Sequence, residues 1–279
     1  MKAFTLPLLP DSEATMSVYL NDRFYDAHEH GSRPMMVVFP GGGYRFTSDR
    51  EADPIALAYL HAGYQACVVR YSVNSEERAD QPLNNQPLRE AAAAVRLVRE
   101  HASEWGVDPD KVVISGFSAG GHLAGSLGTL WNRADYYPEA GEASRPNAMV
   151  LSYPVIASGE FRHDGSFVNL TGEGTGPKAD RWSLDRLVSK DTCPAFLWHT
   201  VADRCVPVEN SLLMAAALQK EHIPFSLHLY THGEHGLSLA TDEVDSPMPE
   251  VTGWVKLALE WLDSMGLGPV KSTEEWVCR

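Results

Sequence analysis

Residues 112–124 read V-V-I-S-G-F-S-A-G-G-H-L-A. A short apolar run of strand length leads into a serine flanked by glycines, and a run compatible with a helix follows. The segment G-F-S-A-G at 116–120 has the form of a nucleophile elbow, a strained turn between a strand and a helix. The five-residue pattern is a weak signal alone, but in this context it makes Ser118 the candidate nucleophile. The alternative is a glycine-rich turn that only packs the helix on the strand.

Further runs of strand length recur along the chain, with helical patterns between them. The expected strands are 35–39, 66–71, 112–115, 148–153, 195–199 and 226–230. The expected helices are 54–61, 88–105, 122–131, 208–221 and 251–265. This alternation predicts an α/β fold with a mostly parallel central sheet and helices on both faces.

The connection at 158–192 is much longer than a usual loop between a strand and a helix. It contains five glycines and the aromatic residues Phe161, Phe167 and Trp182. Disorder is one alternative, but the aromatic side chains favour a packed, lid-like insertion. The length of 279 residues allows two domains. We predict one catalytic domain over 1–279, with 158–192 as a partial lid.

The charge balance excludes several classes of partner. The 37 acidic and 23 basic residues give a net charge of −14, which repels nucleic acid and anionic membrane surfaces and favours neutral over anionic substrates. The uncharged stretch 112–132 contains five glycines and is a poor membrane helix. The first residues lack the long apolar run of a secretory signal. We therefore expect a soluble, cytoplasmic protein.

Four cysteines, Cys67, Cys193, Cys205 and Cys278, are too few for a disulfide framework in a chain of this length, and none forms a C-x-x-C pair. We interpret them as free thiols in a reducing compartment. Cys205 lies two residues from a candidate acid, Asp203, and we expect it to be a spectator.

The candidate polar residues gather where the expected strands end. In a parallel sheet, ligands bind outside the carboxyl ends of the strands. P-G-G-G-Y at 40–44 follows one strand, and Ser118 follows the next in the elbow. Asp203 follows the strand at 195–199, and T-H-G-E-H-G at 231–236 follows the last strand. Nucleophile, acid and base candidates therefore share one edge of the sheet.

A serine hydroxyl needs a base and an orienting acid, which in hydrolases of this kind follow in the order Ser, Asp or Glu, His. Of the histidines beyond Asp203, His222 and His228 fall in helix and strand patterns that favour structural roles. His232 and His235 share one loop, and spacing leaves both open with a slight preference for His235. Spacing alone also allows Asp203 to be a solvated turn residue.

Acyl transfer also requires donors for a developing oxyanion. The backbone N–H of Ala119, directly after the nucleophile, is one candidate. The loop containing Gly41, Gly42 and Gly43 is the other, because glycine lets the backbone approach a substrate closely. The alternative is a loop that is only flexible.

Several segments together resemble a known family. They include P-G-G-G-Y at 40–44, S-D-R-E-A-D-P at 48–54, G-F-S-A-G-G-H-L-A at 116–124, S-Y-P-V at 152–155, F-L-W-H-T at 196–200, D-R-C-V-P at 203–207 and G-E-H-G-L at 233–237. The set resembles the α/β-hydrolase fold and, within it, hormone-sensitive-lipase-like esterases, especially small acetyl esterases of the acetyl xylan esterase type. Pro40 stands where the H-G-G-G loop of that group has histidine, and proline stiffens a loop by fixing φ.

The resemblance implies specific roles. It assigns the acid to Asp203 and the base to His235, and it places the oxyanion donors at Gly42, Gly43 and Ala119. Of the residues nearby, Tyr44 either lines the substrate pocket or packs in the core, and His122 is expected to make a structural hydrogen bond.

The expected function is a serine esterase for short-chain acyl esters, particularly acetyl groups on xylo-oligosaccharides or other sugars. It requires neither a metal ion nor a cofactor, and its partner is a small-molecule ester. One alternative is an arylformamidase-like amidase, and another is a binding protein built on an inactive hydrolase fold. The sequence does not decide whether the protein forms a homo-oligomer.

Overall fold

A computed structural model describes residues 1–21, 31–75 and 81–270. In these residues, eight strands form one sheet in the order β1-β2-β4-β3-β5-β6-β7-β8. β2 pairs antiparallel with β1 and β4, and the other neighbours are parallel. The strands are β1 (Lys2–Pro7), β2 (Thr15–Leu20), β3 (Arg33–Phe39), β4 (Gln65–Arg70), β5 (Val107–Phe117), β6 (Ala148–Ser152), β7 (Ala195–Thr200) and β8 (Phe225–Tyr230). The predicted mostly parallel sheet is confirmed.

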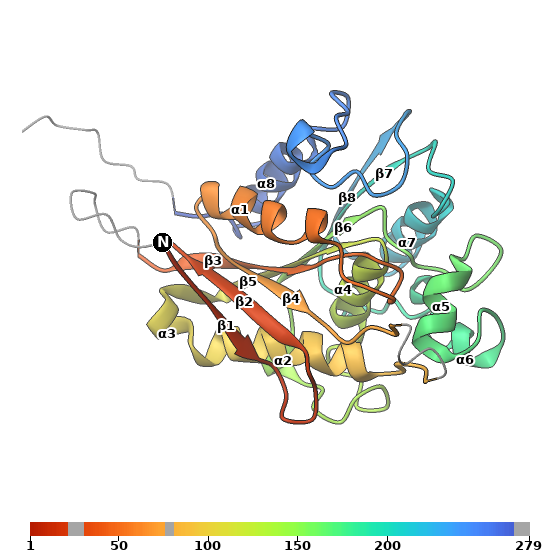
Figure 1. Ribbon diagram of the computed structural model, residues 1–279, viewed down its shortest axis with the longest axis horizontal. Coiled ribbons are helices and arrows are strands. Elements are labelled where there is room, and N and C mark those ends of the chain that lie inside the picture. The colour runs from red at the N-terminus through yellow and green to blue at the C-terminus, as the bar shows by residue number, and fades with distance from the viewer. Residues whose placement is uncertain (22–30, 76–80, 271–279) are drawn as a thin grey trace, which may run out of the picture.

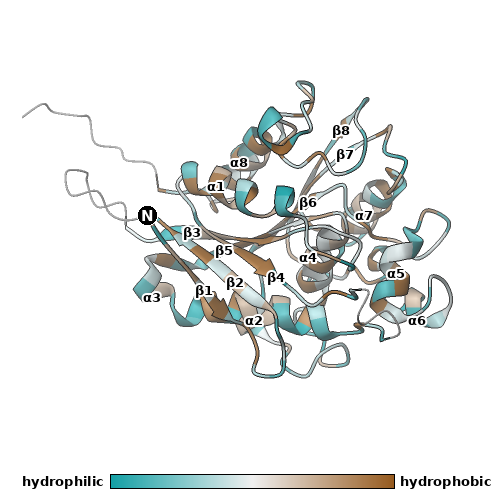
Figure 2. Cartoon of the chain, viewed as in Figure 1, coloured by the Kyte–Doolittle hydropathy of each residue, from teal (hydrophilic) through white to brown (hydrophobic). Residues whose placement is uncertain are grey.

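Helices cover both faces of the sheet (Figure 1). The main helices are α1 (Asp53–His61), α2 (Gln86–Glu100), α3 (Ala102–Trp105), α4 (Ala119–Leu130), α7 (Glu209–Lys220) and α8 (Trp254–Ser264). α1 and α8 pack on one face, and α2, α4 and α7 pack on the other, so two apolar cores sandwich the sheet. Figure 2 shows hydrophobic strands in the centre and hydrophilic residues on the outer surfaces of the helices.

Each expected strand and helix appears within a few residues of its predicted position, with two differences. The antiparallel strands β1 and β2 were not predicted: β1 is an edge strand with mostly exposed side chains, whereas β2 carries the alternating buried residues Met16, Val18 and Leu20, a strand signal that the sequence reasoning missed. The single helix expected at 88–105 was wrong. The chain leaves the helical conformation at His101 (φ −98°, ψ 9°), and the short helix α3 then ends at Gly106 in the left-handed region.

The insertion at 158–192 is folded and packed. It contains α5 (Asp164–Thr171), α6 (Pro177–Asp180) and the 3₁₀ turn η4 (Leu184–Arg186). Phe167, Leu170 and Trp182 are buried in the same core as the side chains of α4. The aromatic residues therefore serve as packing anchors, and the alternative of disorder was wrong. α5 and α6 lie together at one end of the molecule (Figure 1).

Short 3₁₀ turns occupy other connections, at η1 (Asp49–Glu51), η3 (Glu142–Ser144) and η5 (Asp242–Val244). Cys67 and Cys193 are buried free thiols, and Cys205 is an exposed one. Cys278 lies outside the described residues. Across the described ranges, no helix combines the length and apolar character needed to cross a bilayer.

Candidate active site

The nucleophile elbow is built by close backbone packing around Ser118. Ser118 adopts φ 53° and ψ −117° between β5 and α4, a conformation rare for a residue with a side chain. A Cβ at Gly116 would lie 2.2 Å from the carbonyl oxygen of Gly120, and a Cβ at Gly120 would lie 2.1 Å from that of Phe39. Both glycines are therefore required for the helix to start directly behind the serine.

Three side chains from distant parts of the chain form one hydrogen-bonded row. His235 Nε2 lies 2.8 Å from Ser118 Oγ, and His235 Nδ1 lies 2.6 Å from Asp203 Oδ2. Ser118 and Asp203 are buried, with exposed fractions of 6% and 7%. The carboxylate fixes the Nδ1–H tautomer of His235, so that Nε2 can accept the hydroxyl proton of Ser118.

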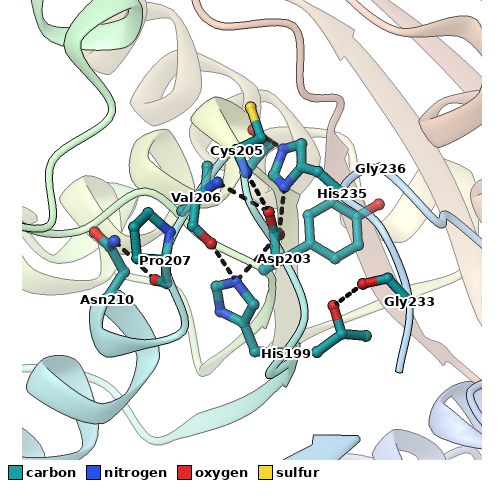
Figure 3. Close-up of polar contacts among 12 residues, drawn as sticks. His199, Asp203, Cys205, Val206, Pro207, Asn210, Gly233, His235 and Gly236 are labelled. Atoms are coloured by element: carbon teal, nitrogen blue, oxygen red, sulfur yellow. Dashed lines mark hydrogen bonds and ion pairs between the residues drawn. The ribbon is translucent and has the colours of Figure 1, made fainter. Parts of the chain in front are cut away.

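Asp203 is held as a carboxylate by several donors (Figure 3). Its Oδ1 accepts hydrogen bonds from the backbone N–H groups of Cys205 and Val206, both at 2.9 Å. Burial favours the neutral acid, but hydrogen bonds from His199, His235 and the backbone outweigh it and hold the pKa of Asp203 well below its usual range. This aspartate is therefore ionised at neutral pH and is not a solvated turn residue.

His199 is a residue of this site that the sequence reasoning missed. It lies at the end of β7, fully buried, with Nε2 3.3 Å from Asp203 Oδ2 and 3.0 Å from the carbonyl oxygen of Val206. Its Nδ1 pairs with Ser211 Oγ at 2.8 Å. The available signal was a polar residue inside the apolar strand F-L-W-H-T at 196–200.

The remaining histidines of the last third of the chain lie away from Ser118. His232 is exposed and pairs with Glu250 Oε2 at 3.1 Å. His228 lies within β8 and pairs with Ser226, and His222 follows α7 with φ 59°. Of the two histidines that spacing left open, the structure brings only His235 to the serine.

The glycine loop after β3 is anchored from beneath by Glu51. Gly41 donates its N–H to Glu51 Oε2 at 2.9 Å, and Tyr71 donates its hydroxyl to the carbonyl oxygen of Pro40 at 2.5 Å. Glu51 is buried, and its Oε1 accepts a hydrogen bond from the Tyr153 hydroxyl at 2.6 Å. Sequence reasoning gave Glu51 no role, although it lies within the segment 48–54.

The loop conformation depends on its second and third glycines. Gly42 and Gly43 have φ values of 127° and 64°, and a Cβ at Gly42 would lie 2.1 Å from the carbonyl oxygen of Phe46. Within the described residues, no acceptor bonds the N–H groups of these two glycines. Ala119 is the first residue of α4, so its N–H is also unused by the helix.

Tyr44 packs in the core and does not line the cavity, so the pocket-lining alternative for this residue was wrong. It is 1% exposed, and its hydroxyl lies 2.9 Å from His122 Nδ1. The expected structural hydrogen bonding of His122 is confirmed, since its Nε2 also contacts the carbonyl oxygen of Trp182 at 2.9 Å. Burial lowers the pKa of His122 to about 4, so the ring is neutral at physiological pH.

A cavity of about 410 Å³ opens over Ser118 and His235. Its walls include Gly42, Gly43 and Phe46 from the segment after β3, His163 and Asn169 from the insertion, and Cys205 from the loop after β7. The volume is in the range of small-molecule sites. In the described parts of the chain, no group of three His, Cys, Asp or Glu side chains is placed to hold a metal ion.

The chain is similar to proteins named as a xylanase and as an acetylxylan esterase. The chain is 38% identical over 234 residues to endo-1,4-beta-xylanase B of Butyrivibrio fibrisolvens, covering 83% of this chain and 36% of that protein. It is 32% identical over 264 residues to acetylxylan esterase of Xylanibacter ruminicola, covering 91% of this chain and 50% of that protein. The chain therefore spans at most half the length of these two relatives.

A solved structure covers nearly the whole chain. The acetyl ester-xyloside bifunctional hydrolase from Caldicellulosiruptor lactoaceticus is 36% identical, with a TM-score of 0.82, and the match covers 95% of this chain and 97% of that one. Fold and relatives together define an α/β hydrolase. The chain belongs to the BD-FAE family, whose model matches residues 21–218.

Proposed function

We propose that this protein is a serine esterase that removes short acyl groups, chiefly acetyl, from xylo-oligosaccharides or other acetylated sugars. The observation that carries the proposal is the row Ser118, His235 and Asp203, joined by hydrogen bonds of 2.8 and 2.6 Å at the floor of a cavity. The resemblance to an acetylxylan esterase and to an acetyl ester-xyloside hydrolase supports the sugar acetate as substrate.

The reaction begins with transfer of the Ser118 proton to His235 Nε2 as Oγ attacks the acyl carbonyl carbon. The N–H groups of Gly42, Gly43 and Ala119 stabilise the negative charge that develops on the carbonyl oxygen. The protonated His235 then gives its proton to the leaving sugar oxygen, and the acyl group remains on Ser118. Asp203 stays ionised and stabilises the imidazolium ring.

A water molecule completes the cycle. It attacks the acyl-enzyme carbonyl while His235 accepts its proton, and collapse of the second tetrahedral intermediate releases the free acid and restores Ser118. Water and ester are the only reactants in this scheme. The oxyanion donors serve both steps.

We also propose that the chain is one catalytic domain and that residues 158–192 act as its partial lid. The support is that His163, Gly165 and Asn169 of this insertion form part of the cavity wall, while Phe167 and Leu170 anchor it in the core. An insertion held in this way shapes the site without needing a separate domain.

A substrate series tests the proposed function. We expect acetylated xylo-oligosaccharides and p-nitrophenyl acetate to be hydrolysed, with rates falling as the acyl chain lengthens toward octanoyl. We expect the Ser118→Ala variant to lose this activity. A preference for N-formylkynurenine over every ester would instead identify an arylformamidase-like amidase. A folded protein that binds sugar acetates without hydrolysing them would identify an inactive binding protein.

A further inference from the structure

His163 joins the insertion to the cavity. It is the N-cap residue of α5, and its Nδ1 accepts a hydrogen bond from the backbone N–H of Ser166 at 3.3 Å. The hydroxyl of Ser166 lies 2.8 Å from the same nitrogen. The Ser166 N–H is shared with the backbone carbonyl oxygen of His163 at 3.1 Å. When Nδ1 accepts from this N–H and from the Ser166 hydroxyl, it carries no proton, and the hydrogen of the neutral ring is on Nε2.

His163 also forms part of the wall of the site. His163 lines the same cavity as Ser118 and His235, and its Cε1 lies 3.8 Å from where a Cβ on Gly43 would be. Across the described ranges, no protein acceptor bonds its Nε2. Burial and the charge of His235 lower the pKa of His163, which favours the neutral ring.

The insertion helix is fixed against the glycine loop, so the ring has a defined position. Asn169, further along α5, donates its side-chain amide to the carbonyl oxygen of Gly43 at 2.8 Å. Phe167 and Leu170, on the same helix, are buried in the core. A donor on a rigid element in the wall of the same cavity as Ser118 is suited to select between substrates.

We propose that the Nε2–H of His163 is a specificity-determining donor that binds a hydroxyl or ring oxygen in the alcohol portion of the ester. The ligand class is an ester of a polyhydroxylated ring, as opposed to an ester of a plain hydrocarbon alcohol. This inference rests on the proposed ester hydrolysis and adds the group that recognises the alcohol. A neutral donor suits an uncharged oxygen, since it pays no desolvation of a full charge.

Two substitutions distinguish the role of His163 as a substrate donor from its role as the N-cap of α5. In His163→Asn, the side-chain oxygen takes the place of Nδ1 as acceptor for the Ser166 N–H and the donor at the Nε2 position is lost. In His163→Gln, the amide nitrogen reaches the Nε2 position and the cap is weakened. His222→Asn is the matched control, because His222 is exposed and outside the cavity wall.

The measurement is the ratio of kcat/KM for a methyl xyloside monoacetate to kcat/KM for cyclohexyl acetate, two acetates of six-membered rings that differ in hydroxylation. We expect the ratio to fall about tenfold in His163→Asn, the effect of one lost hydrogen bond. We expect His163→Gln to retain most of the ratio with a lower unfolding midpoint, and His222→Asn to match the wild type.

An unchanged ratio in His163→Asn, or an equal loss for both esters, would overturn the role of His163 while leaving ester hydrolysis in place. If the wild-type protein hydrolyses neither acetate in a manner that depends on Ser118, the proposed function itself fails. The two failures are therefore distinguishable in one set of assays.

Discussion

Glu51 holds the glycine loop by accepting the Gly41 N–H at 2.9 Å while its other oxygen accepts the Tyr153 hydroxyl. Both oxygens of this buried carboxylate are used as acceptors. A glutamine at position 51 has only one acceptor oxygen, so either the Gly41 N–H or the Tyr153 hydroxyl would lose its acceptor. An unpaired buried donor costs about 1–3 kcal/mol. The position of the loop, and with it the oxyanion donors, therefore depends on an acceptor-only side chain.

The first prediction concerns Glu51→Gln. We expect kcat for p-nitrophenyl acetate to fall about 10–100-fold, because displaced donors stabilise the oxyanion less well. Asp49→Asn is the matched control: Asp49 lies in the same turn, and its side chain is 91% exposed. Equal rates for Glu51→Gln and the wild type would show that Glu51 does not maintain the loop.

The second prediction concerns Asp203→Asn. The amide nitrogen facing His235 Nδ1 would donate a hydrogen bond to it, so Nδ1 would carry no hydrogen and the ring hydrogen would lie on Nε2. A protonated Nε2 can no longer accept the proton of the Ser118 hydroxyl. We expect kcat to fall about 10³–10⁴-fold, with circular dichroism like that of the wild type. A loss of less than tenfold in the folded variant would remove Asp203 from the proposed catalytic row.

The third prediction concerns Gly42→Ala. The added Cβ would meet the carbonyl oxygen of Phe46 at 2.1 Å, and the φ of 127° disfavours any side chain. We expect kcat to fall about 10²–10³-fold, as for loss of an oxyanion donor. Gly253→Ala is the control, since apart from its own neighbours in the chain nothing lies within 4 Å of a Cβ at this position. Similar activity in both variants would argue against the loop as oxyanion hole.

The fourth prediction is a pH dependence of stability that originates at His122. Burial lowers the pKa of His122 to about 4 in the folded protein, against about 6.5 when unfolded. Between these values the unfolded chain binds more protons, so the free energy of unfolding decreases as pH falls from about 6.5 to about 4. The contribution is on the order of 3 kcal/mol.

Urea unfolding at a series of pH values measures this effect. Gln at position 122 retains a donor toward the carbonyl oxygen of Trp182 but does not titrate, so we expect His122→Gln to show a flatter pH profile in that window. Burial also lowers the pKa values of His163 and His228, so part of the slope remains in the variant. An identical slope in variant and wild type would contradict the assignment.

The fold, and the closeness of Ser118, Asp203 and the histidine loop, could be predicted from the sequence because their signals are local. The apolar runs located six strands, and the rule that ligands bind at strand ends brought Ser118, Asp203 and the histidine loop to one edge. The resemblance chose His235 over His232, and the structure gives the physical basis, since only His235 reaches Ser118 Oγ. These features depend on residues within or directly after a strand.

The residues that support the site depend on contacts that no local sequence pattern encodes. Glu51 and His199 act through partners that only the folded chain brings to them, and the packing of Tyr44 depends on His122, 78 residues away. In β1, one of the two edge strands, only Phe4 and Leu6 pack against the core, so it lacks the apolar signal of a central strand. The supporting residues and this edge strand therefore needed the structure.

Ser118 is the proposed nucleophile, and the site of covalent labelling by a fluorophosphonate tests this role. The wild-type protein is treated with the probe, digested and mapped by mass spectrometry. We predict a single adduct on Ser118, no adduct in Ser118→Ala, and loss of esterase activity in proportion to labelling. Full hydrolytic activity after complete labelling of Ser118, or an adduct on a different residue that abolishes activity, would contradict the account.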